Sequence, residues 1–214
     1  TNTAGVVAIL TATATSWIMI GKPELGMSIN GLLAGLVAIT PSCAFVSVTS
    51  SLIIGAVAGV AVVFAVIMFD HLKLDDPVGA LAVHLVNGVL GTLLVGLFAQ
   101  DEIGGISTPN GLFFGGGLGL LGAQAIGVIC AGVFTFAASS VIWLAVKHTI
   151  GLRVSLKEEI EGLDLGEHGH QAYPEFVTHK MPYALIAKDI NTVSVEAGVS
   201  EKVKATELTK QAKI

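Results

Sequence analysis

The feature that most constrains this chain is a long run without charge, which extends from Leu25 to Phe69. Only Lys22 and Glu24 carry charge before it, and most other charged residues follow Val146. A water-soluble fold needs polar faces along its whole length, so this part of the chain must face lipid or other apolar helices. Charged residues make up 13% of the 214 residues, against about a quarter in soluble domains. We therefore predict an all-α, polytopic membrane bundle.

Five membrane-spanning helices are expected, because one span needs about 20 predominantly apolar residues. The uncharged run is longer than one span and should break at Pro41, which lacks a backbone donor and disfavours helix in the residue before it. The expected spans cover residues 3–20, 26–40, 50–69, 78–99 and 118–146. A helix over the last range would be about 43 Å long, so it should tilt or protrude from the bilayer. Residues 1–150 then form a transmembrane region and residues 151–214 a tail.

The basic residues predict the orientation of these spans. Lys22 and Lys73 lie in the first and third loops, whereas the fourth loop carries Asp101 and Glu102. Further lysine and arginine residues follow the last span, so the positive-inside rule places the tail in the cytoplasm and Thr1 outside. The net charge of −5 arises largely from this tail and does not indicate nucleic-acid binding.

Small residues inside the spans predict close helix packing. Gly31 and Gly35 lie one turn apart, and so do Gly55 and Gly59, which lets helix backbones approach closely. The pattern identifies no partner helix. Two cysteines, which are Cys43 and Cys130, lie in apolar stretches and are interpreted as packing residues rather than as a disulfide or a metal site.

His84 is the only ionisable side chain well inside an expected span. Imidazole titrates near neutrality and can donate and accept hydrogen bonds, and in a membrane it usually faces a pathway or a partner. The position alone leaves two interpretations open. His84 either lines a pathway or packs against a neighbouring carbonyl group.

The residues that precede His84 carry a family resemblance. The run from Asp75 to His84 reads Asp-Asp-Pro-Val-Gly-Ala-Leu-Ala-Val-His and resembles the stretch that leads to the second pore histidine of the Amt/Rh ammonium transporters. Other blocks resemble the same family in the same order, at residues 21–23, 31–41, 151–154, 161–164 and 168–169. The resemblance covers about residues 1–173, and several long blocks in the right order are specific.

The resemblance implies helices seven to eleven of an eleven-helix fold with two inverted halves around a pore. It implies ammonium or ammonia as substrate, paired pore histidines of which His84 is the second, and a homotrimer in the plasma membrane. The first pore histidine belongs to the other half, and the long last helix suits the eleventh helix, which straps the outside of the family's fold. PII-type signalling proteins dock near the cytoplasmic tail in this family, and no cofactor is expected.

Two residues near His84 have competing interpretations. Asp76 begins the fourth span just before Pro77, where a carboxylate can cap free N–H groups; we favour this cap over proton transfer. Asn87 lies one turn beyond His84 and could share its face of a helix. The family often has cysteine at that position, so Asn87 is assigned only as a candidate pore-adjacent residue.

The tail is expected to begin with a short helix. Ser155 and Glu158 match a capping box, and Gly162 is expected to stop the helix after Glu161. The resemblance implies a regulatory segment that contacts a neighbouring subunit. Its candidate residues are Gly151, Arg153, Glu161, Gly162, Asp164, His168, Gly169 and Tyr173. A metal site at His168 and His170 is considered and set aside, because two histidines on a turn are usually solvated. Residues 174–214 are polar, match no family block and are expected to be partly disordered.

Three functions compete for this chain. Transport ranks first, and an ammonium sensor of the same fold ranks second, because the segment after Tyr173 is too short and polar for an output domain. An enzyme ranks last, since no paired carboxylates or nucleophile–base arrangement is visible. The chain holds half a pore and is expected to be a piece of a longer protein or one of two halves.

Overall fold

The computed structural model of the chain describes residues 1–104 and 109–173, in which every regular element is helical. The elements are α1 (Asn2–Ile20), α2 (Leu25–Ile39), α3 (Val48–His71), η1 (Leu81–Val86), α4 (Asn87–Phe98), α5 (Asp101–Gly104), η2 (Leu112–Phe114), α6 (Gly119–Thr149), α7 (Leu156–Glu161) and α8 (Leu163–His168). The prediction of an all-α fold is confirmed. The chain divides into two compact units, Thr1–Ser139 and Ser140–Ile214.

Local capping explains where the first three helices begin and end. Gly21 ends α1 in a left-handed conformation with φ of 82°, which glycine adopts without steric cost. Glu24 begins α2, because its carboxylate accepts hydrogen bonds from the backbone N–H groups of Gly26 at 3.0 Å and Met27 at 2.6 Å. Helix α2 ends at Ile39, just before Pro41, and the Ser47 hydroxyl caps α3. The long uncharged run therefore folds back on itself in the segment that contains Pro41.

Within residues 1–104 and 109–173, four stretches are long and apolar enough to cross a membrane: α1, α3, α6 and the continuous stretch Leu81–Phe98. Helix α2 is also apolar but has 15 residues, about 22 Å of helix, so it is shorter than the ~30 Å hydrocarbon core. Helix α6 has 31 residues, about 46 Å, and exceeds that core. The expected membrane bundle therefore has one short member and one long one.

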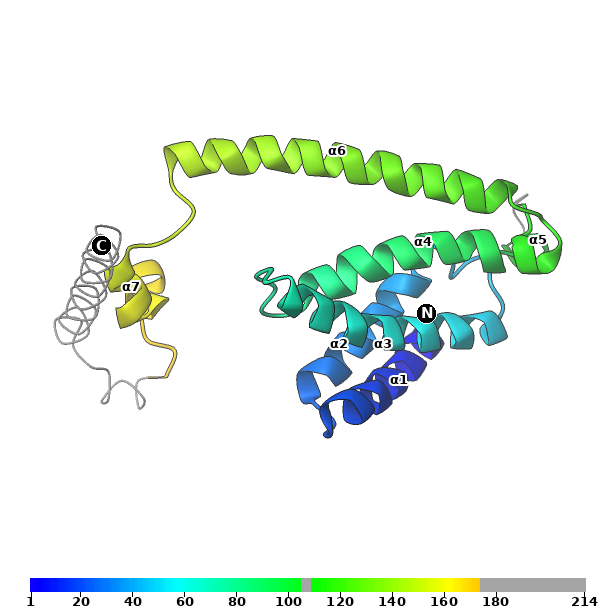
Figure 1. The fold of residues 1–214 in the computed structure, drawn as a ribbon, viewed down its shortest axis with the longest axis horizontal. Coiled ribbons are helices and arrows are strands. Elements are labelled where there is room, and N and C mark those ends of the chain that lie inside the picture. Colours follow the sequence, from blue (N-terminus) through cyan, green and yellow to red (C-terminus); the bar gives the residue numbers. More distant parts are fainter. Residues whose placement is uncertain (105–108, 174–214) are drawn as a thin grey trace, which may run out of the picture. The chain divides into compact units, whose positions relative to one another are not determined.

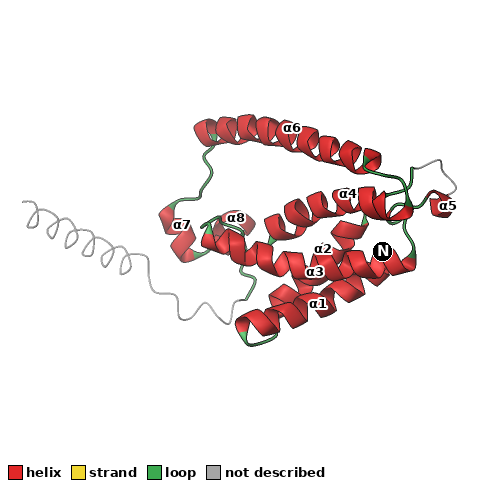
Figure 2. Cartoon of the chain, turned by 45° about the vertical axis from the view of Figure 1, so that its right-hand side comes forward, coloured by secondary structure: helices red, strands yellow, loops and turns green. Residues whose placement is uncertain are grey.

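Helices α1 to α4 pack side by side in the first unit (Figure 1 and Figure 2). The buried face of α1 consists only of small residues, namely Ala4, Gly5, Ala8, Ala12 and Ser16. Both glycine pairs pack against this face, because Gly35 on α2 and Gly55 on α3 each meet the backbone carbonyl group of Ala4. Helix α1 therefore lies against both α2 and α3 at short backbone distances.

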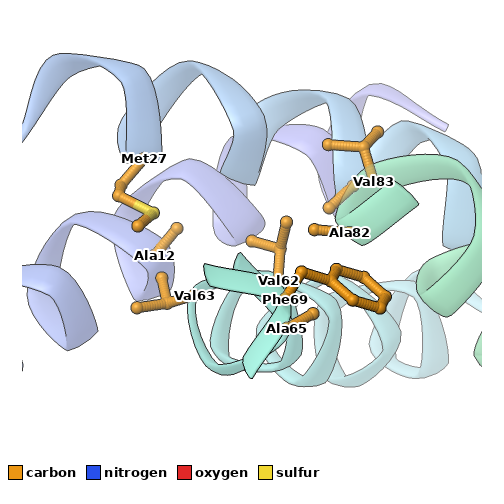
Figure 3. Packing of buried hydrophobic residues seen from close by; sticks show 9 residues of the cluster. Ala12, Met27, Val62, Val63, Ala65, Phe69, Ala82 and Val83 are labelled. Carbon is orange, nitrogen blue, oxygen red and sulfur yellow. The ribbon is translucent and has the colours of Figure 1, made fainter. Parts of the chain in front are cut away.

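The side chains between these helices form two apolar clusters. In the first, Met27 of α2 lies beside Ala12 of α1 and Val63 of α3, as Figure 3 shows. The same cluster extends to Ala82 and Val83 in η1. The core of α2 and α3 therefore supports the short segment η1.

The two cysteines correct one expectation. Cys43 and Cys130 are free thiols, and both are exposed and pack into neither apolar cluster of the described residues, although the sequence led us to expect packing residues. No residue of α6, the helix that carries Cys130, is buried by the described residues. A helix that is apolar all round gains stability only when lipid or other protein covers it.

Candidate functional site

A carboxylate positions the start of η1. Asp76 Oδ2 accepts hydrogen bonds from the backbone N–H groups of Leu81 at 3.0 Å and Ala82 at 3.3 Å. A turn lies between Asp76 and Leu81. In this turn Gly79 has φ of 76°, a left-handed value that favours glycine. The helix therefore begins at Leu81 rather than at residue 78, where the sequence led us to expect it.

Asp76 also lines a cavity of about 440 Å³ together with Glu24, Asn30 and Asp70. Two of these three carboxylates, Glu24 and Asp76, already accept backbone hydrogen bonds as helix caps. In residues 1–104 and 109–173, no three His, Cys, Asp or Glu side chains are grouped so that they could hold a metal ion. We assign these carboxylates a structural role.

His84 lies within η1, which is a π-helical turn rather than an α-helical one. Such turns widen the helix by one residue, and they occur frequently at functional sites. The His84 side chain is exposed, and no hydrogen bond or ion pair joins its imidazole to another described residue. The packing interpretation requires a hydrogen bond from His84 to a neighbouring carbonyl. The described part of the chain contains no such bond.

The His84 side chain opens on a groove with a volume of about 320 Å³. One wall comes from η1 and α4, and the other comes from α6. The lining residues are His84, Leu85, Gly88, Val89 and Thr92 on the first wall, and Gly127, Val128, Ala131, Gly132 and Thr135 on the second. The surface is mostly apolar, and among these described lining residues His84 is the only one with a titratable side chain.

Asn87 does not share the open face of His84. It is fully buried and contributes nothing to the groove lining. Its Nδ2 donates a hydrogen bond to the backbone carbonyl of Ala82 at 2.9 Å. Residues three apart share a face in a regular α-helix. The chain between His84 and Asn87 is π-helical, so these two side chains point in different directions.

Sequence reasoning missed the groove residues on α6 and the two threonines. Glycine and alanine on an apolar helix give no signal beyond close packing. Thr92 Oγ1 donates to the Gly88 carbonyl at 2.8 Å, which is a common arrangement of threonine in any helix. Only the tertiary structure brings these residues opposite His84.

The comparison with known proteins decides the family. A sequence model of the Ammonium Transporter Family matches residues 1–173. The chain belongs to this family. The ammonium transporter Amt2 of Archaeoglobus fulgidus is 38% identical over 191 residues, which cover 88% of this chain and 41% of that protein. The curated relatives are named transporters rather than enzymes, as expected. The family and the long apolar helices together show that the chain is a membrane protein.

Two solved structures share the fold of this chain. A protein named "Sensor Amt Protein" is 36% identical with a TM-score of 0.69, and the match covers 78% of this chain and 40% of that one. Saccharomyces cerevisiae Mep2 is 29% identical with a TM-score of 0.70, covering 85% of this chain and 42% of that one. The chain spans about two fifths of the length of each of these relatives. The fold class predicted from the sequence is confirmed.

The tail of this chain contains three predicted regulatory glycines with positive φ. Gly151, Gly162 and Gly169 have φ of 92°, 88° and 72°, and a side chain at such a position would strain the backbone. Asp164 Oδ2 accepts a hydrogen bond from the Ala172 N–H at 3.1 Å. The chain after α8 is thereby tied back to the start of α8.

The capping box in the tail is formed as the sequence predicts. Ser155 Oγ and the Ser155 backbone N–H donate to Glu158 Oε2 at 2.6 and 3.0 Å, and Glu158 N–H donates back to Ser155 Oγ. These bonds hold the pKa of Glu158 below its ordinary value. A carboxylate with a lowered pKa stabilises the fold above its unfolded pKa, so the box is lost as the pH falls through the lowered value.

The remaining predicted tail residues are Arg153, Glu161, His168 and Tyr173. Arg153, His168 and Tyr173 are exposed, and the His168 carbonyl contacts His170 Nδ1 at 2.8 Å. The side chain of Glu161 and residues 174–214 lie outside the described residues, as does the expectation of disorder there. Their predicted roles stay predictions.

Proposed function

We propose that the protein carrying this chain conducts ammonium or ammonia across the plasma membrane, and that the His84 groove is one wall of the conduit. The observation that supports this most directly is an exposed imidazole without a partner among the described residues, on an apolar surface of a helix long enough to span a membrane. Membership of the ammonium transporter family supports the choice of substrate.

The chemistry of the groove favours ammonia over ammonium inside the conduit. Moving an ammonium ion into an apolar environment is costly unless it is paired, and the groove offers no carboxylate. Neutral ammonia loses much less hydration and can exchange hydrogen bonds with an imidazole, which both donates and accepts. In the proposed mechanism ammonium releases its proton before it enters, and the imidazole accepts a hydrogen bond from ammonia, donates one to it, or relays the proton.

The groove forms one side of the proposed conduit, and the opposite side is proposed to come from residues outside this chain. The relatives are longer, since this chain spans 41% of Amt2 and 42% of Mep2. The pairing of His84 with a second histidine and the assembly into a homotrimer are parts of the same proposal.

The proposal is tested by expressing the whole protein in cells that lack ammonium uptake. Growth on low ammonium and uptake of labelled methylammonium should both be restored. A sensor is the competing function, favoured by the likeness to the structure named "Sensor Amt Protein". If the protein reaches the membrane folded but restores neither growth nor uptake, transport is wrong and the sensor function is preferred.

We further propose that residues 151–173 form a cytoplasmic segment that contacts a neighbouring subunit and lies near the docking site of a PII-type signalling protein. The capping box and the three positive-φ glycines give this segment a defined conformation, which supports such a contact. Truncation after Val154 should therefore lower uptake severalfold while the protein stays folded in the membrane. Unchanged uptake at equal surface abundance would remove the segment from the mechanism.

The side of the membrane is checked on the same segment. With Cys43 and Cys130 first replaced by alanine, because both thiols are exposed, Lys157→Cys should react with an impermeant thiol reagent only in permeabilised cells. Glu102→Cys serves as the matched control on the opposite side and should react in intact cells. The reverse pattern would invert the orientation.

A further inference from the structure

Asn87 makes two hydrogen bonds to carbonyl groups at the end of η1, one from its main chain and one from its side chain. In a π-helix the carbonyl of residue i accepts from the N–H of residue i+5, so the Ala82 carbonyl would accept from the Asn87 N–H. The same N–H donates to the carbonyl of His84. The Asn87 side chain donates to the Ala82 carbonyl at 2.9 Å. The side chain thus gives the Ala82 carbonyl a hydrogen bond at the place where the π turn returns to α-helix.

The orientation of the Asn87 amide follows from this contact. A carbonyl accepts only from a donor, so the amide nitrogen must face Ala82, because the flipped amide would place two oxygens together. Oδ1 is buried and has no hydrogen-bond donor among the described residues. An apolar side chain would avoid the desolvation of that oxygen. The bond from Nδ2 is therefore what asparagine contributes here.

We propose that Asn87 is a positioning residue, which fixes the π turn through the Ala82 carbonyl and thereby presents His84 to the groove. His84 lies between the two residues that this bond joins, and its own carbonyl accepts the Asn87 N–H. Ala82 is fully buried against the cluster of α2 and α3, so the bond anchors the turn to the bundle. The effect on transport rests on the proposed function, whereas the effect on the turn does not.

The deciding experiment uses two substitutions in the whole protein, purified into lipid nanodiscs and reconstituted into vesicles with equal pH on both sides. Asn87→Leu removes the donor and keeps the side chain apolar and similar in size. Asn87→Asp replaces the donor with an oxygen that can donate to the Ala82 carbonyl only when the carboxyl group is protonated. Thr149→Val is the matched control, since it removes a side-chain bond to a carbonyl at Ala145 in α6.

The first readout is amide hydrogen exchange over residues 79–90, which requires no transport. Exchange in Asn87→Leu should be about tenfold faster than in the wild type, because a buried carbonyl loses its partner and the turn opens more often. Thr149→Val should leave exchange over these residues unchanged. Wild-type exchange in Asn87→Leu would mean that Asn87 only fills space, and would overturn the proposal.

The second readout is uptake as a ratio to the wild type at each pH. For Asn87→Asp the ratio should rise about tenfold between pH about 8 and pH about 5, as the carboxyl group gains a proton. Asp70 and Asp76 line the cavity beside this turn and His84 lies within it, and the ratio divides out the pH dependence that these groups give to both proteins alike. For Asn87→Leu the ratio should be low at every pH.

A ratio for Asn87→Asp that stays constant with pH, in a folded protein, would refute the donor role. A wild type that takes up no ammonium would refute the proposed function instead. In that case hydrogen exchange over residues 79–90 would still decide whether Asn87 holds the turn.

Discussion

His84→Ala should lower ammonium uptake by up to about tenfold in the whole protein, because it removes the imidazole from the groove, which can donate to ammonia, accept from it and relay a proton. The loss should appear in uptake per folded protein rather than in protein abundance, since the His84 side chain is exposed and holds no hydrogen bond with a described residue. The measurement is labelled methylammonium uptake in vesicles.

His84→Glu tests the same residue through charge. A carboxylate in an apolar conduit attracts cations, so this variant should carry a potassium current that the wild type lacks. His71→Ala is the matched control, because His71 is an exposed histidine at the end of α3 and does not line the groove. If both His84 variants keep normal uptake and normal selectivity, His84 is a packing residue and the proposed site is wrong.

Gly55→Ala should destabilise the bundle by about 1–3 kcal/mol, the usual cost of forcing a methyl group into a packed core. A Cβ atom at residue 55 would lie 2.7 Å from the Cα atom of Ala4, and backbone atoms cannot move aside as a flexible side chain can. Helices α1 and α3 would have to separate. The midpoint of thermal unfolding in detergent should therefore fall.

Gly122→Ala provides the matched control for this prediction. A Cβ atom there would meet no atom of the described chain within 4 Å, and alanine favours a helix over glycine by about 1 kcal/mol. Its unfolding midpoint should stay equal or rise slightly. Equal midpoints for Gly55→Ala and the wild type would show that α1 and α3 do not depend on this close approach.

The sequence alone determined the elements that depend on neighbours along the chain. The uncharged run predicts apolar helices, Pro41 predicts the break between α2 and α3, and Ser155 with Glu158 predicts the start of α7. The family also followed from sequence, because several ordered blocks resemble the ammonium transporters over residues 1–173. Each of these signals acts within a few residues or by direct comparison, so no knowledge of the tertiary structure is required.

The tertiary structure alone decided which faces of these helices meet. A helix that is apolar all round has no polar stripe to mark its exposed side, so the glycine pairs of α2 and α3 give no sign that both pack on α1. For the same reason the sequence does not predict that His84 is exposed and that Asn87 is buried. Their separation depends on the π turn between them, which is anchored by Asp76 at one end and by the Asn87–Ala82 bond at the other. Both bonds join residues five apart, beyond the spacing that a regular α-helix would predict.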